Sequence, residues 1–173
     1  MIGALALSAL TLMTVNGRVF DGRMIPGNYD YAQASISVDP ATANPGLQSE
    51  WLGSESGGDL IQIGWWWWGG GHEALPFFQL WVNGQELVNP IINYPLPVGS
   101  NENVSLVNKP GTEHWTAYLL EGSTWVSIWA GDAGTSAKYW EVSSESQIGV
   151  IPPIPCAGVG LGRGAYVPRT WVF

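Results

Sequence analysis

The sequence predicts an all-β protein, an antiparallel two-sheet β-sandwich of jelly-roll-like form. Short apolar runs recur along the chain and are separated by turn-forming pairs such as Asn83-Gly84 and Gly57-Gly58. Apolar and polar residues alternate in several runs, as in residues 32–38, which buries one face of a strand and wets the other. An apolar period of 3.6 residues, free of glycine and proline, is missing. The expected strands cover residues 4–15, 32–38, 49–53, 60–68, 77–82, 104–108, 115–121, 124–130, 137–143 and 165–172.

The composition indicates a protein that works outside the cell, secreted or at the cell surface. Charged residues make up 12% of the 173 residues, against about 25% in a typical domain, and the net charge is −8. The six basic residues form no cluster, so we expect no nucleic-acid partner. Cys156 is the single cysteine, so neither an intrachain disulfide nor a cysteine metal site can form. We expect no cofactor and no metal.

The chain divides into an apolar N-terminal segment, residues 1–28, and a single domain over residues 29–173. Residues 1–15 are nearly all apolar, lack the basic leader of a signal peptide and are too few to span a bilayer, so we expect no membrane span. Two roles stay open for this segment. It is either a strand of the chain's own sheet or an arm that pairs with a neighbouring copy, which would build a homo-oligomer or a homopolymer.

Four consecutive tryptophans, residues 65–68, follow Gln62 on one expected strand. Alternation places two of the rings on each face and puts Gln62 on the same face as Gly64 and Trp66. Gly64 would leave room beside the amide for a ligand or for another backbone. The rings have three possible roles: core packing, a groove for a sugar or an extended peptide, or a subunit contact.

Several stretches, in the same order, resemble the neprosin-type domain between about residues 29 and 167. That family opens with a strand ending in a proline turn, a tryptophan-containing strand, and a strand with Glu or Gln before x-Gly-Trp. The pairing of Gln62 with Glu141 also resembles that of the eqolisin glutamic peptidases, which have a sandwich architecture. The similar stretches are residues 31–40, 49–53, 61–65, 115–118, 137–142 and 155–160.

This resemblance implies a peptidase that uses two side chains and an activated water. Glu141 would act as general base on the water and later return the proton to the leaving amine. Gln62 would orient the water and hydrogen-bond the oxygen that becomes negative in the tetrahedral intermediate. The substrate would be a polypeptide in an aromatic groove. The implied groove residues are Trp65, Trp66, Trp67, Trp68, Tyr139 and Trp140.

The sequence departs from the family at two points. Tyr139 and Trp140 stand where the family has two glycines before its Glu, and the family's disulfide cysteines are absent. The leading hypothesis is a secreted acid endopeptidase. One alternative is a catalytically inactive extracellular structural protein that self-assembles through its apolar N-terminal strand, since a fold does not fix a function. The other is a carbohydrate-binding module with a tryptophan platform.

Overall fold

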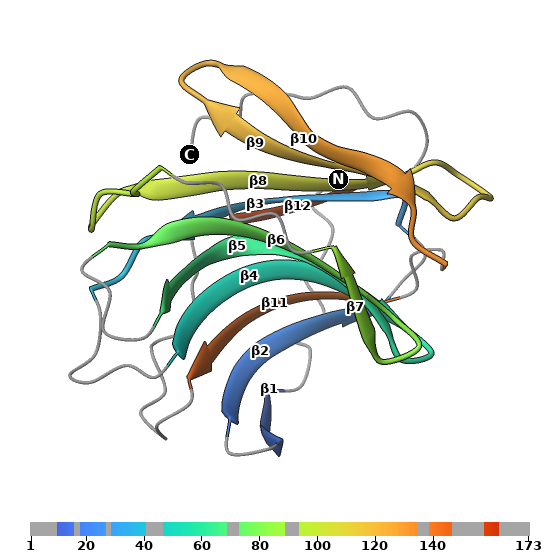
Figure 1. Ribbon diagram of the computed structural model, residues 1–173, viewed down its shortest axis with the longest axis horizontal. Coiled ribbons are helices and arrows are strands. Elements are labelled where there is room, and N and C mark those ends of the chain that lie inside the picture. Colours follow the sequence, from blue (N-terminus) through green and yellow to red (C-terminus); the bar gives the residue numbers. More distant parts are fainter. Residues whose placement is uncertain are drawn as a thin grey trace, which may run out of the picture.

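The computed structural model describes residues 10–15, 18–26, 29–40, 47–68, 73–88, 94–134, 139–146 and 158–162. These residues form two antiparallel sheets, which confirms the predicted all-β sandwich (Figure 1). The strands are β1 (Leu10–Val15), β2 (Arg18–Pro26), β3 (Tyr31–Ser37), β4 (Leu47–Ser56), β5 (Asp59–Trp68), β6 (Leu75–Val82), β7 (Gln85–Val88), β8 (Asn101–Asn108), β9 (His114–Glu121), β10 (Thr124–Asp132), β11 (Tyr139–Ser146) and β12 (Gly158–Gly162).

The two sheets differ in size and shape. The larger sheet has seven strands in the order β1-β2-β11-β4-β5-β6-β7, and the smaller has five in the order β10-β9-β8-β3-β12. The strands of the larger sheet bow strongly, with their hollow side turned away from the smaller sheet (Figure 1). Within the described residues, no helix is long and apolar enough to cross a membrane.

Local turn chemistry sets the hairpins that the sequence predicts. Asn83 and Gly84 join β6 to β7 with φ values of 52° and 73°, the left-handed pair that a two-residue hairpin turn requires. The backbone N–H of Asn83 also donates to Asp59 Oδ1 at 2.7 Å, which ties this turn to the start of β5. The Asn-Gly turn therefore fixes where β6 ends and β7 begins.

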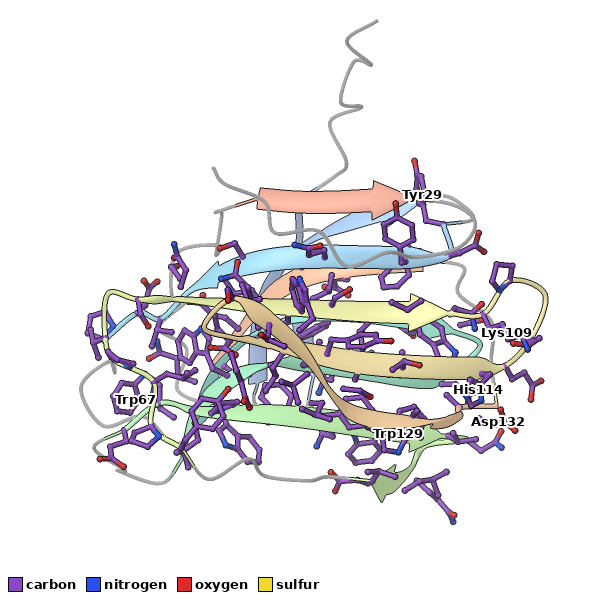
Figure 2. The ribbon with its side chains drawn as sticks, turned by 90° about the horizontal axis from the view of Figure 1, so that it is seen from above. Tyr29, Trp67, Lys109, His114, Trp129 and Asp132 are labelled. Atoms are coloured by element: carbon purple, nitrogen blue, oxygen red, sulfur yellow. The ribbon has the colours of Figure 1, made fainter. Side chains whose placement is uncertain are left out.

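The core lies between the two sheets and is rich in aromatic rings. Trp129 on β10 stacks on Phe78 of β6 with ring centroids 5.0 Å apart (Figure 2). Trp115 on β9 meets Trp140 of β11 at 5.7 Å. Both contacts join one sheet to the other, and burial of such large apolar surfaces is the main favourable contribution to folding.

The tryptophan run of β5 divides between the two faces of the sheet, as alternation predicts. Trp65 and Trp67 point into the core, where they are 0% and 4% exposed. The Nε1 atom of Trp65 donates to the carbonyl oxygen of Ser37 at 2.7 Å, and that of Trp67 donates to the carbonyl oxygen of Asp39 at 3.0 Å. The hydrogen bonds of the two indoles thus link β5 to the end of β3 in the other sheet.

Part of the predicted N-terminal segment belongs to the chain's own larger sheet. β1 pairs antiparallel with β2, and β2 pairs antiparallel with β11. The structure therefore gives these residues an intrachain role, while residues 1–9 lie outside the described part of the chain. Self-assembly through this segment stays a prediction.

Gly64 lies where two backbones approach closely. A Cβ atom built on Gly64 would lie 2.0 Å from the carbonyl oxygen of Glu50 and 2.7 Å from the Cα of Trp51, both on β4. The sequence left two roles open for this glycine, room for a ligand or room for another backbone. The structure shows the second. A side chain here must push β4 and β5 apart.

Gly64→Ala should therefore lower the free energy of unfolding by about 3 kcal/mol, at the upper end of the cost of overpacking. Gly57→Ala is the control, because nothing lies within 4 Å of its Cβ position and only its φ of 65° is unfavourable, at about 1 kcal/mol. Urea denaturation measures both variants. Equal losses for the two variants would contradict the close approach at Gly64.

Candidate functional site

The pairing of three strands brings Gln62 and Glu141 into one row across the larger sheet. Gly53 of β4 is the register partner of Gln62 on β5 and also of Glu141 on β11. Neighbouring strands lie about 4.8 Å apart, so the Cα atoms of Gln62 and Glu141 are separated by about 10 Å. Side chains at paired positions project from the same face, so Gln62 and Glu141 share a face with only a glycine between them.

This face is the one turned away from the core. Ile61 and Ile63, which flank Gln62, are fully buried in the core, and so is Trp140, which precedes Glu141. Because side chains alternate along a strand, Gln62 and Glu141 project to the opposite, hollow side of the bowed sheet (Figure 1). The sheet therefore presents the two side chains on its concave face.

An indole covers the glycine in this row. A Cβ atom on Gly53 would lie 2.8 Å from Cζ3 and 3.0 Å from Cε3 of Trp51, two residues earlier on β4. The Trp51 ring thus leans along its own strand and rests on the backbone of Gly53, and the indole is 4% exposed. The buried indole therefore fills the space over Gly53, between the positions of Gln62 and Glu141. The sequence signal for this contact is the Trp-x-Gly spacing, because residues i and i+2 of a strand lie on the same face and the glycine leaves room for the ring.

Gln62 is held by a chain of polar side chains from the two neighbouring strands. Its Nε2 donates to Oε1 of Gln79, its register partner on β6. Nε2 of Gln79 donates in turn to Oε1 of Glu86 on β7 at 2.7 Å. Gln62 is only 6% exposed, so the bond that it donates to Gln79 provides an acceptor for an amide that is otherwise costly to bury. Sequence reasoning did not identify Gln79 or Glu86.

The aromatic residues expected to line a groove with Gln62 do not all lie on its face. Trp65, Trp67 and Trp140 face the core, which corrects that expectation. Each lies an odd number of residues from Gln62 or Glu141 along its strand, so its side chain projects from the opposite face of the sheet. The Nε1 atom of Trp140 donates to the carbonyl oxygen of Tyr29 at 3.2 Å, so this bulky neighbour turns away from Glu141.

Trp66 does lie on the face of Gln62. It is partly exposed and stacks on Phe77 of β6, with ring centroids 5.3 Å apart. The backbone of Tyr139 pairs with Glu55 and that of Trp68 pairs with Leu47, and the side chains of Tyr139 and Trp68 lie outside the described part of the structure.

Other polar groups lie apart from this row. His114 Nδ1 lies 3.0 Å from Asp132 Oδ1 at the end of the β9–β10 pair (Figure 2). Among the described residues, no group of three or more His, Cys, Asp or Glu side chains is placed to hold a metal ion. A pocket of about 420 Å³ is lined by Tyr94, Glu102, Leu120, Glu121 and Gly122, beside the smaller sheet.

Two buried carboxyl groups are shifted towards their neutral forms. Burial raises the pKa of Glu50 from 4.5 to about 9, and the negative charge of Asp39 adds to the shift. Neither carboxyl oxygen of Glu50 has a hydrogen-bond partner in the described structure. Burial likewise raises the pKa of Glu102 to about 7; the charge of Glu121 also raises it, while the hydrogen bond from Tyr94 lowers it.

Comparison with known proteins finds similar folds among solved structures. No family model and no curated protein matches the sequence. The structure is similar to scytalido-glutamic peptidase, solved with a peptide-based transition-state analogue, with a TM-score of 0.56, 14% identity, and coverage of 83% of this chain and 74% of that chain. It is also similar to a Bacillus licheniformis β-glucanase, with a TM-score of 0.51, 12% identity, and coverage of 74% and 57%.

These likenesses show the fold alone, because the identities are low. The architecture is that of glutamic peptidases and equally that of glucanases. The neprosin-type resemblance is not confirmed by a family match.

The buried carboxyls make stability depend on pH. Between pH 4.5 and the raised pKa values, folded Glu102 and Glu50 hold protons that the unfolded chain has released. Their contribution to stability is therefore complete below pH 4.5 and is lost as the pH rises through about 7 and then about 9. The melting temperature should fall by several degrees between about pH 5 and about pH 8.

Glu102→Gln should reduce this decline by about half between about pH 5 and 7, since glutamine does not titrate while Glu50 still does. Glu113→Gln, at an exposed carboxylate, is the matched control and should leave the slope unchanged. Calorimetry across the pH range measures both. A melting temperature of the wild-type protein that rises between about pH 5 and 7 would contradict the shifts.

Proposed function

We propose that this chain is an acid endopeptidase of the glutamic type, in which Gln62 and Glu141 hold the attacking water. The observation that carries the proposal is the single row of Gln62, Gly53 and Glu141 on one face of the sheet. The likeness of the fold to scytalido-glutamic peptidase supports it. A neprosin-type enzyme, secreted and acting on polypeptides, is the specific form that we propose.

The separation of the two side chains suits one water molecule. Each side chain reaches several ångströms from its Cα, and the Cα atoms lie about 10 Å apart, so one water fits between amide and carboxylate. The missing side chain of Gly53 leaves the space that the Trp51 ring occupies, so the indole forms the apolar floor on which this water would rest. A water enclosed by apolar surface and two polar groups is oriented by those groups.

The reaction would follow from these positions. Ionised Glu141 takes a proton as the water oxygen bonds to the scissile carbonyl carbon, and Gln62 donates to the oxygen that becomes negative. As the carbon–nitrogen bond breaks, Glu141 gives the proton to the leaving amine. A neutral amide needs no protonation to donate, so only the Glu must be in the correct ionisation state.

The purified protein should cleave denatured protein between roughly pH 3 and 6, the range in which carboxyl groups titrate. Glu141→Gln should lower kcat/KM at least about 100-fold because it removes the general base. Gln62→Ala should lower it by about 100-fold through loss of the oxyanion contact. Peptide mapping of a denatured substrate by mass spectrometry measures both effects.

Glu113→Gln is the control, because it removes an exposed carboxylate on the turn before β9 and should keep full activity. The proposal would be contradicted if the wild-type protein cleaves no denatured protein over this pH range. The catalytically inactive alternative would then stand, with the Trp51 ring between Gln62 and Glu141 closing the gap to substrate.

A sugar-binding function is the second candidate, favoured by the Trp66 platform. Trp66 is partly exposed and rests on Phe77, which holds the indole in one orientation on the hollow face. Aromatic faces in such positions suit the apolar faces of sugar rings. The likeness of the fold to β-glucanase supports this candidate, again through the fold alone.

If sugar binding is the function, Trp66→Ala should weaken retention on insoluble β-glucan at least tenfold, because it removes the stacking surface. Trp125→Ala, at a partly buried tryptophan on the other sheet, is the control and should bind like wild type. A pull-down series at increasing polysaccharide concentration gives both affinities. Wild-type protein that stays in the supernatant would exclude this function.

A further inference from the structure

We propose that Glu86 and Gln79 are positioning residues, which together determine which atom of the Gln62 amide is turned towards the reacting water. The inference rests on the proposed peptidase function and adds two residues to its site. Neither residue would touch the substrate. Both act through the hydrogen-bond chain that runs from β7 through β6 to β5.

The Asn83-Gly84 turn places Glu86 opposite Trp81 in regular register. Gln79 lies two residues from Trp81 on β6 and therefore projects from the same face. Glu86 is its diagonal neighbour across the strand pair, and the Glu86 carboxylate lies 2.7 Å from the amide nitrogen of Gln79. The register shift between β6 and β7 begins beyond the pair of Trp81 with Glu86.

The charge at the end of the chain sets the direction of both bonds. An ionised carboxylate can only accept hydrogen bonds, so Gln79 must turn its NH2 group towards Glu86. The carbonyl oxygen of Gln79 then faces Gln62, which must answer with its own NH2 group, as observed. Gln79 therefore binds the amide nitrogen of Gln62 and not its amide oxygen.

This orientation matters for a water held between Gln62 and Glu141. One proton of the water can bond to the Gln62 oxygen and the other to the Glu141 carboxylate, which leaves an oxygen lone pair free to attack. The second N–H of Gln62 remains available for the oxyanion. With the amide reversed, the N–H of Gln62 would donate to the water, occupy one of its two lone pairs and leave one of its protons without an acceptor. A neutral group at position 86 permits either orientation.

The test compares Glu86→Gln, which removes the charge, with Gln79→Met, which removes the bridge and keeps the length of the side chain. Each should lower kcat about fivefold with KM within twofold, as for an interaction that matters mainly in the transition state. Glu86→Asp keeps the charge, so its kcat should lie between that of Glu86→Gln and that of the wild-type protein. Glu73→Gln, at an exposed carboxylate just before β6, is the matched control and should equal wild type.

A second readout does not depend on activity. The side-chain amide proton and nitrogen resonances of Gln62, assigned by comparison with Gln62→Ala, should move in Glu86→Gln and in Gln79→Met but not in Glu73→Gln. Spectra are recorded near pH 6, where an ordinary carboxylate is ionised. Melting temperatures of the four variants exclude unfolding as the cause.

The outcomes separate the two proposals. The positioning role alone would be overturned if the wild-type protein cleaves peptides, Glu86→Gln has the same kcat, and the Gln62 resonances do not move in that variant. A wild-type protein that cleaves nothing ends the peptidase proposal and with it the positioning role of Glu86 and Gln79 in catalysis. Shifted Gln62 resonances with lowered kcat and unchanged KM support the proposal.

Discussion

β4 lies between β5 and β11, and its hydrogen bonds to both strands fix Gln62 and Glu141 in one row. These residues are far apart in the sequence, and only the shared partner Gly53 defines their separation. Gly64 lets β5 approach β4 closely, because its missing Cβ leaves room for the β4 backbone. The larger sheet is therefore the rigid element on which any chemistry of this face depends.

Some of this arrangement follows from local sequence. Most of the strands, the Asn83-Gly84 turn and the shared face of Gln62 and Trp66 were predicted, because period-two patterns and turn chemistry act over a few residues. The strands β2, β7 and β12 were not predicted, and the strand expected over residues 165–172 lies outside the described part of the chain. The pair of Glu141 with Gln62 came from a family resemblance. Which tryptophans of residues 65–68 enter the core could not be predicted, because both faces of that run are equally apolar.

Long-range pairing determined what the sequence could not reveal. The contact of Gln62 with Gln79 depends on the register in which β5 pairs with β6, which no local pattern marks. The Trp51 ring lies over Gly53, a position that a side-chain rotamer sets and that the pattern of the strand does not specify, although both residues stood in one predicted strand. The pairing of β1 and β2 beside β11 is likewise a property of the whole sheet.

The position of β11 has a consequence for the order of folding. This strand is drawn from near residue 140 yet is inserted between β2 and β4, which come from the first third of the chain. A nascent chain that ends before β11 has no strand to join β2 to the rest of the sheet, so half of the row at Gly53 is missing. The concave face is completed only when the late strand enters, and an incompletely synthesised molecule carries Gln62 without its carboxylate.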